Sequence, residues 1–264
     1  MFKKSFIAAM SLTALLALGG CAQQAPEKEG PDYADDEAMA LIADGLEARS
    51  DVAEQQILDG TTGTNASYQE AVQTELDIVS PLRDRQFEDS ELQERVLAYI
   101  NILNDSLDVV ANYPVSDANF LLKWAEVYDE RTALINGFVT DYGLALDAEH
   151  QSVLDEMSAN GAAAIQQDAV DEAVGSMVES LVFEKQSNGY GYFTYVSTAQ
   201  NTSGYSLENV SIVLSLYDAE GVKVKETYVN TTSWAVDETV RFEGFGDVDA
   251  VQIKPTLQYY TVVE

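Results

Sequence analysis

The chain of 264 residues contains 45 acidic and 14 basic residues, and its formal net charge is −31. A surface this acidic repels nucleic acids and anionic lipid headgroups, because proteins bind both through Lys and Arg side chains that neutralise phosphate. Nucleic-acid binding is therefore excluded, whereas cations or basic partners would be attracted. Cys21 is the only cysteine and His150 the only histidine, which also excludes an internal disulfide and zinc sites built on several Cys or His ligands.

Residues 1–20 are typical of a bacterial lipoprotein signal peptide. Lys3 and Lys4 precede an apolar run over residues 6–18, and the lipobox ends in Leu18, Gly19, Gly20 and Cys21. The run is shorter than the ~20 apolar residues of a membrane-spanning helix. We predict cleavage before Cys21 and attachment of a diacylglycerol to its thiol, which would hold the protein on the outer face of the cell membrane. An ordinary signal peptide or an apolar first helix of a cytoplasmic protein are the alternatives.

Residues 21–32 are predicted to form a flexible tether behind the lipidated cysteine. They contain Pro26, Gly30 and Pro31 and have no hydrophobic periodicity. With this spacer and its negative charge, we expect the body of the protein to stand away from the membrane.

Residues 33–180 are predicted to form an acidic, antiparallel bundle of four to six helices. Apolar residues recur at spacings of three and four, as in the series Leu92, Val96, Tyr99, Leu103, Leu107 and Val110. Breaks are expected at 60–63, at Pro81, at 113–114 and at Gly143. Asp89 or Ser90 is predicted to cap the third helix and Ser116 or Asp117 the fourth.

Residues 181–264 change to an alternating pattern that predicts a small antiparallel β-sandwich of five to seven strands. Val210, Ile212, Leu214 and Leu216 are apolar at every second position, and the turn at 218–221 leads into a hairpin partner. Further strands are expected at 190–200, around Val240 and Phe242, and at 251–261. The segments 185–189 and 201–204 are predicted to be turns. The whole chain is thus expected to be an α+β protein of two domains.

Two arginines interrupt the apolar stripes of the helical half. Arg49 follows Leu46 by three residues and Arg131 follows Trp124 by seven, so each faces the predicted core. An unpaired buried guanidinium costs several kcal/mol, so each requires a carboxylate partner. Glu75 is the candidate partner, because it continues the face of Tyr68 and Val72. The pattern predicts an internal ion pair, and the alternative is a cleft in which Arg49 and Arg131 hold an anionic ligand.

The sequence contains no specific catalytic or metal-binding motif. Acidic residues are numerous enough to supply the two carboxylates of a glycoside hydrolase, but they lie where helix starts and solvated helix faces place acids in any case. No segment has the spacing of a strong calcium loop. His150 lies in a polar segment and is expected to be a solvated helix residue. We predict a non-enzymatic protein that uses no cofactor and no metal.

The C-terminal half resembles the FxLYD domain of bacterial surface lipoproteins. The resemblance covers about 80 residues, 183–262, and rests on the strand 190–200, Asn201-Thr202-Ser203, Leu214-Ser215-Leu216-Tyr217-Asp218, Gly221 and the segment from Trp234 to Phe242. Leu214 stands where the family has Phe, and Asp237 where a Gly often precedes Glu-Thr. The resemblance implies an immunoglobulin-like sandwich of unassigned function and brings no catalytic residue with it.

The helical half, at residues 45–49 and 130–135, is similar to the helical region that precedes such domains in lipoproteins of Gram-positive bacteria. This similarity implies attachment to a single cytoplasmic membrane.

Two functions follow as hypotheses. In the first, the anchored protein is a non-enzymatic binding or structural module of the cell envelope, and its tyrosine-rich C-terminal half contacts a protein, peptide or cell-wall partner. In the second, Arg49 and Arg131 organise a pocket of the helical half that binds an anionic ligand or, with nearby carboxylates, hydrolyses a substrate.

Overall fold

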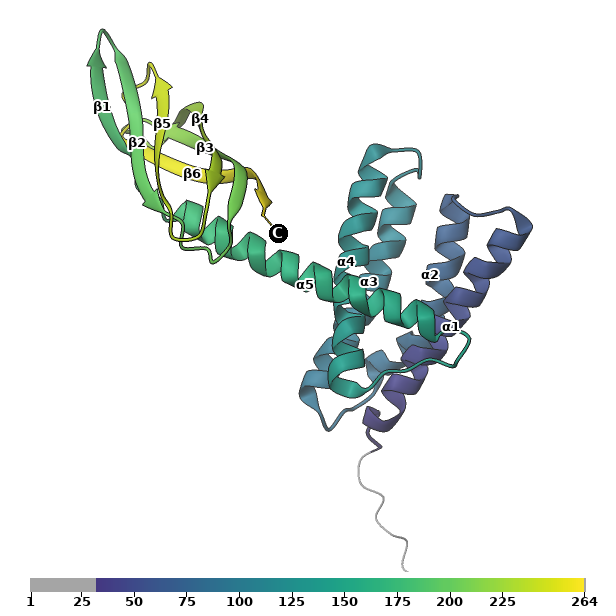
Figure 1. Ribbon diagram of the computed structural model, residues 1–264. Coiled ribbons are helices and arrows are strands. Elements are labelled where there is room, and N and C mark those ends of the chain that lie inside the picture. The colour runs from purple at the N-terminus through teal and green to yellow at the C-terminus, as the bar shows by residue number, and fades with distance from the viewer. Residues whose placement is uncertain (1–31, 264) are drawn as a thin grey trace, which may run out of the picture.

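The computed structural model describes residues 32–263, which form five α-helices followed by six β-strands (Figure 1). The lipobox and Cys21 lie outside the described residues, so the lipid anchor stays a prediction. The helices are α1 (Asp35–Asp59), α2 (Asn65–Val79), the short 3-10 helix η1 (Ser80–Asp84), α3 (Ser90–Asn112), α4 (Ala118–Tyr142) and α5 (Gln151–Glu179). None of the helices within 32–263 combines the length and the apolarity needed to cross a membrane.

Helix boundaries follow local capping chemistry. Of the residues predicted as caps, Asp89 precedes α3, and its carboxylate accepts hydrogen bonds from two backbone N–H groups. Asp117 precedes α4 and accepts one, from the backbone N–H of Asn119. Gly143 ends α4 with φ of 70°, a left-handed conformation that favours glycine. A capping box at Thr64 and Ser67 starts α2.

The helices pack in chain order around one hydrophobic cluster. Successive helices are neighbours in space, and their apolar stripes meet at fully buried residues such as Ile42, Leu103, Ile135 and Phe138. The packing of α5 on α4 is very close at Gly161. A Cβ atom at this position would lie 2.0 Å from the carbonyl oxygen of Thr132, so only glycine fits at this crossing.

The strands form two antiparallel sheets of three strands each, in the orders β1-β2-β5 and β4-β3-β6. The strands are β1 (Glu184–Gly189), β2 (Tyr192–Gln200), β3 (Leu207–Tyr217), β4 (Lys223–Trp234), β5 (Thr239–Gly246) and β6 (Gln252–Val262). Both sheets contribute to a second hydrophobic cluster, which contains Tyr195, Leu214, Trp234 and Phe242. The rings of Trp234 and Phe242 meet edge to face, with centroids 5.0 Å apart.

The prediction of a turn at 185–189 is wrong, because these residues belong to strand β1. Residues 184–187 and Gly189 pair with β2, and the turn of the hairpin lies at 190–191. Every residue of β1 is exposed. A strand without a buried face has no apolar alternation, so periodicity could not detect it.

Helix α5 belongs to both hydrophobic clusters. Leu154 near its start is buried with the other helices, whereas Val170, Val174 and Val178 are buried with the sheets. Between these two parts, residues 162–169 are exposed except for the partly buried Ala164. Secondary structure changes from helix to strand between Glu179 and Glu184, but the second cluster already begins at Val170.

Candidate functional site

Four helices converge on the carboxylate of Glu75, which lies on α2. Arg49 of α1 donates a hydrogen bond from Nη1 to Oε2 of Glu75 at 2.8 Å. Arg131 of α4 donates from Nη2 to both carboxylate oxygens, at 2.9 and 2.8 Å. Tyr99 of α3 donates its hydroxyl to Oε1. The structure therefore brings together the three residues singled out in the sequence and adds Tyr99, and we name these four residues the Glu75 cluster.

Burial strengthens the electrostatic interactions within the Glu75 cluster. Glu75 and Tyr99 are 0% exposed and Arg131 is 2% exposed. Burial alone would raise the pKa of Glu75, but the guanidiniums of Arg131 and Arg49 outweigh it and hold that pKa below its ordinary value. Burial and the neighbouring carboxylate raise the pKa of Tyr99. Glu75 is thus ionised and Tyr99 neutral, and the cluster carries one excess positive charge.

The hydrogen bonds of the Glu75 cluster join α1, α2, α3 and α4 inside the helical half. The carboxylate already occupies the position where an anionic ligand would meet both guanidiniums. Cavities of about 850, 650 and 640 Å³ elsewhere in the described part of the chain are lined by other residues. Within residues 32–263, Nε of Arg131 is the buried side-chain nitrogen or oxygen atom that has no hydrogen-bond partner.

Sequence reasoning missed the role of Tyr99. It appears in the apolar stripe of its helix and was counted there as a core residue. Its ring does lie in the core, edge to face with Phe138 at 5.5 Å. Its hydroxyl, however, needs a partner when buried, and a tyrosine facing inward beside two inward arginines is the signal that could have identified it.

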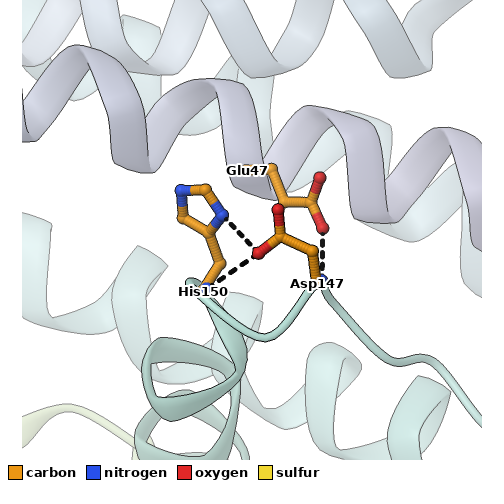
Figure 2. Close-up of side chains that lie close together, drawn as sticks. All are labelled: Glu47, Asp147 and His150. Carbon is orange, nitrogen blue, oxygen red and sulfur yellow. Dashed lines mark hydrogen bonds and ion pairs between the residues drawn. The ribbon is translucent and has the colours of Figure 1, made fainter.

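A second cluster of titratable groups surrounds His150, at the start of α5 (Figure 2). The imidazole Nδ1 lies 2.8 Å from Oδ1 of Asp147, and Nε2 lies 3.0 Å from Oδ1 of Asp51 on α1. The backbone N–H of Asp147 donates to Oε1 of Glu47 at 2.7 Å. These contacts fasten the loop between α4 and α5 to α1.

The expectation that His150 is solvated is wrong, because its side chain is only 12% exposed. The sequence could not show this, since Asp51 is distant along the chain. The hydrogen bond to Asp147, followed by that to Asp51, raises the pKa of His150 against the opposing effect of desolvation. The geometry suits an imidazolium that donates from both ring nitrogens.

Among the described residues, Glu47, Asp147 and His150 are those that could converge on a metal ion, because their ligand atoms lie within 4.8 Å of one another. A metal would require a neutral imidazole with one nitrogen free. Both nitrogens of His150 contact carboxylates, and the raised pKa favours the protonated form. The arrangement is therefore better suited to an ion-paired clamp than to metal coordination.

A third feature is a cavity of about 850 Å³ between α5 and the strand β6, which we name the α5–β6 groove. Strand β6 lies at the edge of its sheet and runs beside α5 (Figure 1). The polar and aromatic residues that line the groove are Gln166, Gln167 and Asp171 of α5, Gln258, Tyr259, Tyr260 and Thr261 of β6, and Tyr205 from the loop before β3. The groove has the size of many ligand sites in proteins.

Hydrogen bonds between helix and strand hold one part of the groove closed. The hydroxyl of Tyr260 donates to Asp171, and Nε2 of Gln167 donates to the Tyr260 hydroxyl at 3.1 Å. Burial, together with the hydrogen bond to Asp171, raises the pKa of Tyr260 to about 12. Tyr259 remains 56% exposed. The groove therefore combines a fixed polar group with an accessible aromatic ring.

No protein-family model matches this chain, and no curated protein sequence matches it. Among solved structures, it is similar to the Pseudomonas fluorescens alkylpurine DNA glycosylase AlkC bound to DNA containing an abasic site analog. That similarity has a TM-score of 0.20 and 11% sequence identity, and it covers 78% of this chain and 68% of the other. A similarity at this level establishes neither a shared fold nor a shared function.

Proposed function

We propose that this protein is a lipid-anchored, extracytoplasmic binding module of the bacterial cell envelope and that it is not an enzyme. The observation that carries the proposal is the α5–β6 groove, a cavity of about 850 Å³ that combines the exposed ring of Tyr259 with amide and carboxylate side chains. Recognition of a ligand by such a groove requires no catalytic group. The signal sequence and Cys21 supply the predicted location.

The proposal includes an FxLYD-like, immunoglobulin-like sandwich for the C-terminal half. Two three-stranded antiparallel sheets that share one hydrophobic cluster support it. The two departures from the family pattern are accommodated locally. Leu214 is 0% exposed, so it occupies a core position that an aromatic ring could also fill. Asp237 has φ of 63°, the left-handed conformation that favours glycine and that Asp tolerates.

The second hypothesis, an anion-binding or hydrolytic pocket at Arg49 and Arg131, loses support from the Glu75 cluster. Both guanidiniums donate to the same buried carboxylate. An external anion would have to displace the carboxylate of Glu75, which is 0% exposed.

The anchor is tested by replacing Cys21→Ser and following the protein in membrane and medium fractions of the expressing cell. We expect the variant to be released or left unprocessed, because the thiol that carries the lipid is gone. Ala22→Ser is the matched control and should stay in the membrane fraction. Normal membrane retention of Cys21→Ser would overturn the proposed anchoring.

Binding at the groove is tested on intact cells with a photo-crosslinking amino acid at position 259. The same amino acid at Ile57, an exposed residue of α1 with 69% exposure, serves as the control. We expect envelope material to be captured from position 259 and not from position 57. Equal capture from both positions, or none from position 259, would contradict a binding function of the groove.

A further inference from the structure

We propose that the α5–β6 groove binds an uncharged oligosaccharide. The inference rests on the proposed binding function and deepens it, because it assigns the chemical class of the ligand.

The aromatic residues of the groove provide a surface for the apolar face of a sugar ring. Tyr205, Tyr259 and Tyr260 line the groove; Tyr259 is 56% exposed and Tyr205 is partly buried. A pyranose presents C–H groups on one face, and these pack against the electron-rich face of an aromatic ring. Tyrosine offers this contact area with little loss of side-chain entropy on binding, because only two torsions are fixed.

The polar residues of the groove match hydroxyl groups. Gln166, Gln167 and Gln258 each contain an amide, which donates and accepts hydrogen bonds, as a sugar hydroxyl also does. Gln258 Oε1 already accepts a hydrogen bond from Ser211 at 2.9 Å, which leaves its N–H groups to donate. Asp171 is oriented by Tyr260 and can accept from one more hydroxyl. Hydrogen bonds thus hold the amides of Gln167 and Gln258 and the carboxylate of Asp171 in the lining of the groove.

The charge of the groove excludes anionic ligands. Its lining contains Asp171 and no Lys, Arg or His. The whole chain carries a formal charge of −31, so an acidic ligand would be repelled both locally and at long range. A neutral, hydroxyl-rich molecule has no such penalty.

An extended peptide is the competing occupant, because it could add to the free edge of β6. An added strand would lie about 4.8 Å from β6 along its length. The hydrogen bonds of Tyr260 with Asp171 and Gln167 join the helix directly to β6, and a peptide strand running between them would have to break both. A ligand that lies over Tyr259, beside these bonds, leaves them intact. The oligosaccharide is therefore favoured.

The test is isothermal titration calorimetry of the purified full chain, held in a detergent without a sugar headgroup. The probes are chitotetraose, cellotetraose and maltotetraose, which differ in linkage and substituents but carry no charge. We expect at least one of them to bind with a Kd between roughly 10 µM and 1 mM. Tyr259→Ala and Gln166→Ala should each weaken that binding by at least about tenfold, or abolish it. Tyr259→Phe should retain it because the ring remains.

Tyr228→Ala is the matched control, since Tyr228 is a 50% exposed tyrosine on β4, at the other edge of the same sheet. Its affinity should be unchanged. Absence of heat with all three sugars up to about 10 mM, or equal affinity of Tyr259→Ala and the unmodified chain, would overturn the proposal. So would binding of a lysine-rich extended peptide at the groove without binding of any sugar. These outcomes are independent of the Cys21 and crosslinking results, so the proposed function can stand if the ligand class fails.

Discussion

Glu75 is the acid that pairs with both inward-facing arginines of the helical half. It is fully buried and accepts hydrogen bonds from two guanidiniums and one phenol. A buried ion pair of this kind contributes little net stability compared with apolar residues of the same size, yet removal of one partner leaves an uncompensated charge in the core. The cluster therefore specifies how α1, α2, α3 and α4 are placed relative to one another.

We expect Glu75→Gln to lower the free energy of unfolding by about 3 to 5 kcal/mol, because the buried Arg131 and the partly buried Arg49 would then lack a counter-charge. Urea unfolding followed by far-UV circular dichroism measures the change. Asp77→Asn is the control, since Asp77 is an exposed acid on the same helix, and it should change stability by less than about 0.5 kcal/mol. A loss below about 1 kcal/mol for Glu75→Gln would show that water reaches the cluster.

His150 is expected to make stability depend on pH near neutrality. Its pKa in the folded chain is raised above the ordinary value of 6.5 by Asp147 and Asp51. The imidazolium thus stabilises the folded state fully below pH 6.5, and this contribution is lost as the pH rises through the raised pKa. His150→Gln should lower the urea midpoint most at low pH, and its difference from the unmodified chain should shrink above neutrality.

The same prediction has a direct spectroscopic check. Because His150 is the only histidine, the titrating imidazole C–H resonances in the NMR spectrum belong to it alone. We expect a titration midpoint above 6.5 in the unmodified chain and a lower midpoint in Asp147→Asn. A midpoint at or below 6.5 in the unmodified chain would rule out the ion-paired clamp.

Two glycines of helix α5, Gly161 and Gly175, differ in the space around them. An added Cβ at Gly161 would collide with the backbone of Thr132, whereas at Gly175 it would meet nothing within 4 Å. Gly161→Ala should force α5 away from α4 and destabilise the protein by about 1 to 3 kcal/mol. Gly175→Ala should stabilise it by about 0.5 to 1 kcal/mol, because alanine is the better helix former. Urea unfolding of both variants tests the pair, and equal effects would show that the close crossing is absent.

The elements that the sequence predicts well are those with one buried face. The stripe of α3 and the alternation of β3 each meet a single core, and Asp89, Asp117 and Gly143 mark helix ends through local hydrogen bonds or a left-handed turn. Strand β1 was missed because all its residues are exposed. Helix α5 has no single stripe, because its two ends are buried in different clusters.

The candidate sites also differ in how far the sequence predicts them. Arg49, Arg131 and Glu75 could be predicted as partners, because each interrupts or continues an apolar stripe and a buried charge needs a counter-charge. Asp51 and His150 could not, since nothing local indicates that a loop folds back on α1. The α5–β6 groove was also beyond prediction. It exists only where a helix and a sheet edge pack together, so Gln166 and Tyr259 show no pattern in the sequence that links them.

For the whole molecule, the formal charge of −31 is expected to oppose folding through self-repulsion. Added salt screens this repulsion, because the Debye length falls from about 30 Å at 0.01 M to about 3 Å at 1 M. We expect the Tm to rise with NaCl and to level off once the repulsion is screened. A Tm that falls with salt would show that the surface ion pairs outweigh the repulsion, and a linear rise without a plateau would indicate a general salt effect instead.

The exposed stretch of α5 at residues 162–169 joins the part of the helix that packs on the other helices to the part that packs on the sheets. Eight helical residues span about 12 Å, and their Ala- and Gln-rich sequence keeps the helix stable without a core around it. The sheets are thereby held by a stiff rod rather than by a loose linker. This stretch fixes the direction in which the groove faces relative to the other helices, because α5 is packed into both hydrophobic clusters. Motion between the helices and the sheets is thereby limited, which lowers the entropy that a ligand of the proposed groove would have to remove.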